Sequence, residues 1–194
     1  MSTSTIVIIA IVVVLLILLI GMYNNLVKLR EIVNKAFKDI NVQLKRRADL
    51  FTNLTETVKG YASHESGIFE QFAQARKATM ESAKNPTAEN QKLMNESFGS
   101  ALTGMRAIAE QYPDLKANEN FAQLQSSIEA TENDIQNARS YYNGVVREYN
   151  TKIKVFPQVI FAKIFGFGER DYWDSGNQEE LDKGLDTTNV AVKF

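Results

Sequence analysis

Catalytic chemistry has few starting points in this sequence, which contains one histidine and no cysteine. A di-iron site in a helical bundle needs two Glu-x-x-His motifs, and a Ser-His-Asp triad needs a nucleophile turn near its histidine. His64, followed by Glu65, has neither, and the sequence lacks the phosphate-binding pattern G-x-x-x-x-G-K-S/T. Gly166-Phe167-Gly168 is too short and too aromatic to cradle a phosphate. We therefore predict a protein that is not an enzyme and has no catalytic residue, metal site or cofactor.

One charged side chain, Arg47, falls on the apolar seam of a predicted helix. Two interpretations stay open. In the first, Arg47 lays its aliphatic stem along the seam and reaches solvent with its guanidinium group. In the second, it forms a desolvated ion pair with a carboxylate on a later helix, for which Glu132 is the candidate. Such a pair adds little stability but would fix the register of the helices.

The seam belongs to a long amphipathic segment in which residues recur at spacings of three and four. Its members are Val33, Phe37, Ile40, Leu44, Arg47, Phe51, Leu54, Val58 and Tyr61. This spacing is typical of a helix that packs against another helix. The pattern continues past Gly60 to about residue 83, so the residues alone do not decide between a turn near 60–67 and one continuous helix.

Two further segments carry the same pattern, and the three prolines fall at their boundaries. Pro86, Pro113 and Pro157 interrupt the pattern, because proline is poorly tolerated inside helices. Thr87 and Asn118 are the predicted N-caps of the two segments. We therefore predict an all-α fold in which residues 28–157 form an up-and-down antiparallel four-helix bundle with long, coiled-coil-like helices.

An uncharged apolar segment precedes this domain, and no Lys, Arg, Asp or Glu occurs before Lys28. Residues 6–23 would span roughly 27 Å as a helix, about the thickness of a bilayer's hydrocarbon core. A cleaved signal peptide is disfavoured, because the first five residues carry no basic side chain and no A-x-A site follows. We predict that residues 1–27 form a single transmembrane helix that remains as an anchor. Its representative residues are Ile6, Ile11, Leu16, Ile20 and, at the headgroup level, Tyr23.

Charge predicts the orientation of this anchor. Seven basic residues follow the apolar segment between Lys28 and Arg47, and no charged side chain precedes it. The positive-inside rule then predicts a protein of the cell membrane with its N-terminus outside and its C-terminal domain in the cytoplasm. The net charge of −1 argues against a dedicated nucleic-acid binder.

Residues 158–194 form the predicted C-terminal tail, which is first aromatic and then acidic. The apolar segment 156–167 is too short to span a membrane, so it packs under the bundle, lies in the lipid interface or contacts another subunit. Residues 169–194 have seven acidic and three basic side chains, a net charge of −4. They end in a β-like alternation that is either disordered or extended on a partner. The candidate interface residues are Phe156, Ile160, Phe161, Phe165, Phe167, Trp173, Val190, Val192 and Phe194.

Short stretches along nearly the whole chain resemble one known family. They are YNNLV at 23–27, NVQLKRRADL at 41–50, NL at 53–54, VKGYA at 58–62, HE at 64–65, AR at 75–76, YPDL at 112–115, AR at 138–139, YN at 142–143 and 149–150, FP at 156–157 and VKF at 192–194. Taken together, they resemble the LemA family. One departure is Phe51-Thr52, where similar proteins tend to have an aliphatic residue and a proline.

The resemblance implies a bacterial, single-pass membrane protein with an up-and-down helical bundle, and it favours a turn near Ser63. Members of the family generally lack an assigned biochemical activity, and a LemA-like protein is associated with magnetosome membrane formation. We therefore expect a non-enzymatic structural or scaffolding protein that forms homo-oligomers and organises the membrane or membrane proteins. The alternative is an adaptor or accessory subunit of another membrane protein, such as a protease or a sensor kinase. The expected partners are the lipid bilayer and further copies of the chain, but no nucleic acid.

Overall fold

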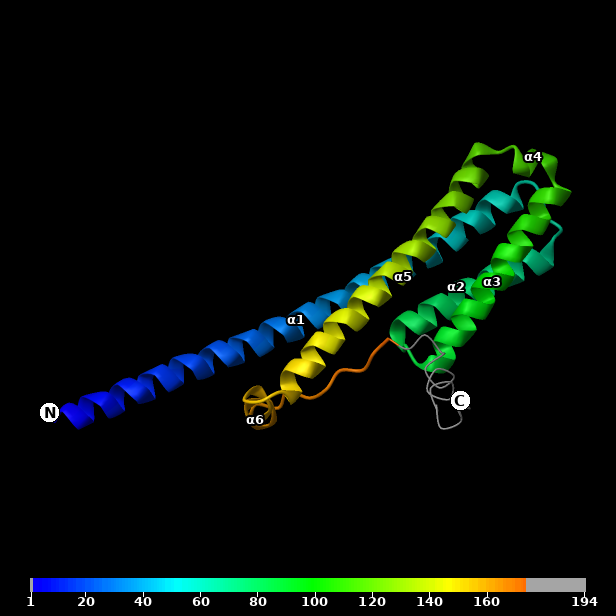
Figure 1. Cartoon of the computed structure of the whole chain (residues 1–194). Coiled ribbons are helices and arrows are strands. Elements are labelled where there is room, and N and C mark those ends of the chain that lie inside the picture. Colours follow the sequence, from blue (N-terminus) through cyan, green and yellow to red (C-terminus); the bar gives the residue numbers. More distant parts are fainter. Residues whose placement is uncertain (1, 174–194) are drawn as a thin grey trace, which may run out of the picture. The chain divides into compact units, whose positions relative to one another are not determined.

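The computed structural model describes residues 2–173 and is all-helical over that range, with no strand (Figure 1). The described helices are α1 (Thr3–Lys59), α2 (Ser66–Lys84), α3 (Ala88–Gln111), α4 (Pro113–Lys116), α5 (Glu119–Lys154) and α6 (Gln158–Ile164). The predicted all-α class is therefore confirmed for these residues. The up-and-down four-helix arrangement and the three predicted domain ranges stay predictions, and the terminal pattern that ends at Phe194 lies outside the described residues.

Helix α1 joins the apolar N-terminal segment and the amphipathic seam in one helix of 57 residues. No proline interrupts it, so the heptad pattern and the backbone hydrogen bonds continue from one segment into the other. The helix ends at Lys59, and residues 60–65 form turns, in which the Ala62 amide donates to the Val58 carbonyl at 2.9 Å. The turn near Ser63 is therefore present.

The apolar part of α1 is long enough and hydrophobic enough to cross a membrane. Nearly all of its large side chains are exposed, from 47% at Ile9 and Val13 to 63% at Ile17. An all-round apolar surface of this kind suits a hydrocarbon environment. The single N-terminal apolar helix thus suggests membrane anchoring.

The predicted N-caps are present at the starts of α3 and α5. The Thr87 hydroxyl accepts a hydrogen bond from the Asn90 amide at 3.2 Å, and the Asn118 side-chain oxygen accepts one from the Phe121 amide at 3.0 Å. The Asn118 side-chain amide also donates to the Tyr61 hydroxyl at 2.8 Å. Both caps satisfy amides that the helix itself leaves without partners.

The chain divides into two compact units, and α1 and α5 each contribute residues to both. The described part of the first unit comprises residues 2–38 and Arg139–Tyr172, and that of the second comprises residues 39–138 and Trp173. The second unit has a core of residues from α1 to α5, in which Phe51 lies 6.2 Å from Phe72 and 6.0 Å from Phe98, measured between ring centroids.

Helices α2 and α3 approach closely at Gly104 of α3. A methyl group added there would meet the side-chain oxygen of Gln71 and would lie 2.5 Å from Cδ1 of Ile68, both on α2. By contrast, a methyl group added at Gly99, on the same helix, would find no atom within 4 Å. Gly104 therefore permits the close packing of α2 on α3, whereas Gly99 has no packing role in the described structure.

Candidate functional site

His64 is exposed in the turn between α1 and α2. Within residues 2–173, no group of three or more His, Cys, Asp or Glu side chains is placed to hold a metal ion. Three other features of the described residues concentrate charge or apolar surface: a buried arginine, an aromatic cluster beside the apolar part of α1, and a groove between α1 and α2.

Arg47 is buried in the second unit, and its side chain has no exposed surface. Its Nη1 donates to Glu132 Oε2 on α5 at 2.7 Å, and its Nη2 donates to the Thr79 hydroxyl on α2 at 3.3 Å. The guanidinium carbon lies 4.6 Å from the centroid of the Phe98 ring on α3. The arginine of α1 thus contacts the three other long helices, and the structure brings Arg47 and Glu132 together as a pair.

The partners of Arg47 compensate its buried charge in different ways. Glu132 supplies the opposite charge and keeps 23% of its side chain exposed, so water reaches one end of the pair. Thr79 accepts from Arg47 and donates to the Ala75 carbonyl at 2.7 Å, so its single donor has a partner. The Phe98 ring presents its negative face to the cation. Thr79 and Phe98 both lie in segments that the spacing predicts to be helical, but spacing alone did not show that they meet the arginine.

An aromatic cluster lies beside α1 in the first unit, where the apolar segment ends. The Tyr23 ring lies 5.1 Å from Phe165 and 5.7 Å from Phe167, edge-on to both. Arg30, two helical turns further along α1, places its guanidinium carbon 5.2 Å from the Phe167 centroid. These contacts attach the segment after α6 to α1, and no pattern in the sequence predicted them.

Helix α5 also holds this segment, through hydrogen bonds between its side chains and the backbone of residues 168–171. Tyr149 donates to the Gly168 carbonyl at 3.0 Å, and Tyr142 donates to the Asp171 carbonyl at 2.9 Å. Asn150 forms two bonds to the backbone of Arg170, donating at 2.8 Å and accepting at 2.9 Å. Burial raises the pKa of Tyr142 and Tyr149, and the positive charge of Arg170 partly opposes both shifts.

The predicted interface residues fall into three groups. Phe156, Ile160 and Phe165 are exposed by 79%, 48% and 55%, while Phe161 is partly buried. Phe167 and Trp173 are buried within the protein itself and offer no surface to a partner. Three more lie outside the described residues: Val190, Val192 and Phe194.

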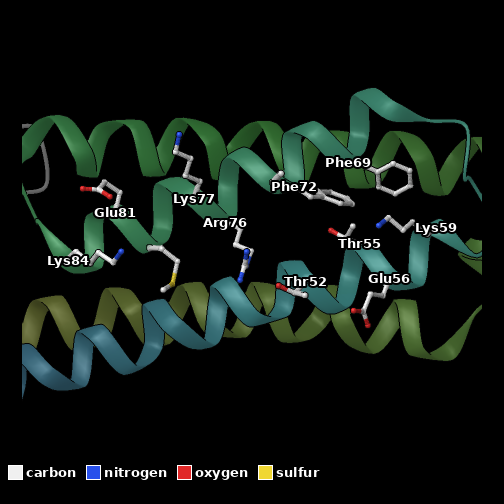
Figure 2. A pocket seen from close by; sticks show the side chains of 12 residues that line it. Thr52, Thr55, Glu56, Lys59, Phe69, Phe72, Arg76, Lys77, Glu81 and Lys84 are labelled. Carbon is white, nitrogen blue, oxygen red and sulfur yellow. The ribbon is translucent and has the colours of Figure 1, made fainter.

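A groove of about 630 Å³ runs between α1 and α2 in the second unit (Figure 2). Phe69 and Met80 provide apolar surface, and the buried Phe72 also lines the groove. Four basic side chains and two acidic ones also line it: Lys59, Arg76, Lys77, Lys84, Glu56 and Glu81. Figure 2 shows Arg76 extending from α2 toward α1. The apolar spacing in the sequence did not predict this groove, because its charged residues lie outside the apolar seams.

The profile of the LemA family matches residues 36–194. The chain belongs to the LemA family. The predicted resemblance is therefore confirmed, and the match includes the groove, the Arg47 cluster and the segment after α6.

Relatives of this LemA-family chain are about a quarter identical to it over the aligned residues. The chain is 26% identical over 178 residues to magnetosome protein MamQ of Magnetospirillum gryphiswaldense, covering 80% of this chain and 65% of the relative. Magnetosome protein MamQ 2 of Paramagnetospirillum magneticum is 25% identical, with the same coverage. Protein LemA of Metamycoplasma hominis is 24% identical over 137 residues, covering 71% of this chain and 62% of the relative. The match thus spans less than two thirds of each relative's length.

Proposed function

We propose that this LemA-family chain is a non-enzymatic, membrane-anchored scaffold whose copies associate and thereby organise the membrane or its proteins. The apolar part of α1 is the anchor, with the N-terminus outside and the larger part of the chain in the cytoplasm, as the basic residues after Tyr23 favour. Membership of the LemA family, with relatives named for the magnetosome, supports a membrane-associated role.

The observation that carries the self-association is the charge of the α1/α2 groove. Its lining has four basic and two acidic side chains, a net charge of +2. Residues 174–194 have five acidic and two basic side chains, a net charge of −3. Opposite charges favour encounter and orient the partners, and the partly exposed apolar side chains of Phe69 and Met80 add contact area. We infer that the acidic C-terminal segment of one copy binds the groove of another.

The native mass of the full-length protein in mild detergent tests this proposal. Wild type is expected to form an assembly that weakens as salt screens the charges. Arg76→Glu with Lys84→Glu should lower the mass, because the groove then repels the acidic segment. Lys92→Glu with Lys116→Glu is the matched control, since it makes the same change in net charge at exposed residues that do not line the groove.

Charge reversal of the tail completes the test. Glu179→Lys with Glu180→Lys should also lower the mass, and combining it with the reversed groove should restore the assembly. A monomeric wild type, or an assembly that both reversals leave intact, would overturn the proposal. A monomer would instead favour the alternative, an adaptor for another membrane protein.

A further inference from the structure

Helix α6 carries a large apolar surface that nothing in the described structure covers. Ile160 is 48% exposed and Ile164 is 69% exposed, and their spacing of four residues places them on one face of the helix. Phe165, directly after the helix, is 55% exposed. Ala162, on another face, is buried. One face of the short helix therefore packs on the protein, while an apolar face is exposed.

The position of α6 along α1 identifies what this face meets. An apolar hollow of about 380 Å³ is lined by Leu19, Ile20 and Tyr23 of α1 together with residues of the α6 region. The residues from the α6 region are Phe161, Ile164 and Phe165. All of these residues belong to the first unit. Helix α6 thus lies beside the end of the membrane-spanning segment.

The depth of this contact follows from the geometry of α1. The stretch from Leu19 to Tyr23 covers about 6 Å of helix axis, and the first charged residue, Lys28, lies about 7.5 Å beyond Tyr23. Interfacial helices bury their apolar face roughly 5–10 Å into the boundary between headgroups and acyl chains. The hollow therefore lies at the depth that such helices occupy.

The attachment of α6 prevents it from leaving this depth as an independent element. The Tyr23 ring contacts Phe165 and Phe167, and Gly166, with a φ of +70°, turns the chain after the helix. The Phe167 amide donates to the Ala162 carbonyl at 2.8 Å, which closes this turn onto the helix. The hydrogen bonds from α5 to residues 168–171 hold the other end of the segment.

We propose that α6 is an interfacial membrane helix, with Ile160, Ile164 and Phe165 inserted among the lipid acyl chains beside the anchor. Lys163 is exposed on the same helix, and its positive charge attracts an anionic headgroup. The occupant of the exposed face and of the hollow is the phospholipid bilayer, because the hollow is continuous with the surface of α1 that crosses it. The inference depends on the anchor in the proposed function but is independent of self-association.

The absence of cysteine in the sequence makes a depth measurement direct, because a single introduced cysteine takes the only thiol-reactive label. Full-length Ile164→Cys and Ile160→Cys proteins are labelled with an environment-sensitive fluorophore and reconstituted in vesicles of phosphatidylcholine and phosphatidylglycerol. Val42→Cys and Leu93→Cys are the controls, since these apolar side chains are exposed by 62% and 53% and lie outside both the anchor and α6.

The labels at 160 and 164 should emit at shorter wavelength than the controls and lose emission to a nitroxide carried on the lipid acyl chain near the headgroup. The labels at 42 and 93 should instead lose emission to aqueous iodide. Iodide quenching at 160 and 164 equal to that of the controls would overturn the proposal. Protection of 160 and 164 that disappears when the protein is diluted in excess lipid would also overturn it, because a second copy would then cover this face.

The Ile164→Glu substitution, combined with a label at position 160, tests the apolar face without a label at position 164. A buried charge at this depth is costly, so the label at 160 should move toward water and become accessible to iodide. Lys163→Glu leaves the apolar face unchanged. It should make the emission of the label depend less on phosphatidylglycerol without exposing the label to iodide. If the labels at 160 and 164 are accessible to iodide while the protein still forms its assembly, the interfacial helix alone is rejected. If the labels are protected by lipid but the protein is a monomer, self-association alone is rejected.

Discussion

Removal of the carboxylate that pairs with Arg47 is the most informative single change in the second unit. The Arg47 side chain is 0% exposed, and its Nη1 lies 2.7 Å from Glu132 Oε2. In Glu132→Ala, the guanidinium group loses this partner while the rest of its surroundings stay in place. Breaking a buried ion pair on one side costs about 3–5 kcal/mol, because the remaining charge is desolvated without compensation. The partner here is 23% exposed, so water reaches the site and reduces this penalty. We expect a loss of about 2–3 kcal/mol in the free energy of unfolding.

The opposite single change should cost less. In Arg47→Met, the charge that remains is that of Glu132, whose partial exposure lets water solvate it. Methionine is flexible enough to fill the space of the arginine stem between Phe98 and Thr79. We expect a loss of about 1 kcal/mol or less, because an apolar residue of similar volume often replaces a buried ionic one at little cost. The double variant should then resemble Arg47→Met, so the two effects do not add.

The assay is thermal and guanidinium unfolding of the four full-length proteins in one detergent, followed by circular dichroism. A loss of 2–3 kcal/mol corresponds to a fall in Tm of roughly 6–12 °C for a domain of this size. Glu129→Ala is the control, since Glu129 pairs with Arg106 at 3.5 Å between side chains that are both half-exposed or more. Surface pairs of that kind contribute about 0–1 kcal/mol. Equal costs for Glu132→Ala and Glu129→Ala, or strict additivity in the cycle, would refute the reasoning.

Three further predictions concern packing and titration. Phe72→Ala should lower the free energy of unfolding by about 3–5 kcal/mol in guanidinium titrations, because the ring is 1% exposed in the core. Gly99→Ala should raise it by up to about 1 kcal/mol, whereas Gly104→Ala should gain nothing because the new methyl meets Gln71; equal gains would contradict the close approach. Burial raises the pKa of Tyr149 above its ordinary 10.0, so the stability that this phenol contributes is complete below pH 10 and is lost as pH rises through the folded value. The ultraviolet titration of wild type minus that of Tyr149→Phe measures this pKa, and ionisation at pH 10 would contradict it.

The helices could be predicted from the sequence because their signals are local. Apolar spacing, the three prolines and the caps at Thr87 and Asn118 each act within one or two helical turns. The turn after Lys59 was harder to predict from the residues, since the heptad pattern continues through it without a proline. There the family resemblance decided what periodicity had left open.

The candidate site was less predictable because its contacts join residues that are far apart in the sequence. Arg47 and Glu132 could be proposed as a pair because a charge on an apolar seam requires a partner. Nothing comparable in the sequence indicates the contact between Arg30 and Phe167. Arg30 is one of the basic residues that follow the anchor, and Phe167 is one of several aromatic residues in an apolar segment, so neither requires the other as a partner. Phe167 was predicted to be an interface residue from composition alone, and composition cannot tell whether an aromatic ring is covered by its own chain.

The buried arginine also bears on which side chains line the groove between α1 and α2. Successive side chains of a helix point about 100° apart around its axis. If α2 shifted by one residue along α1, different side chains would therefore line the groove. Arg47 opposes that slip, because Nη1, Nη2 and the face of its guanidinium each have a separate partner: Glu132, Thr79 and Phe98. A lysine at this position would offer one charge and no planar fork, so it would not hold all three contacts at once. The arginine is therefore better explained by the register of the helices than by their stability, and the register keeps Arg76 of α2 facing α1 across the groove.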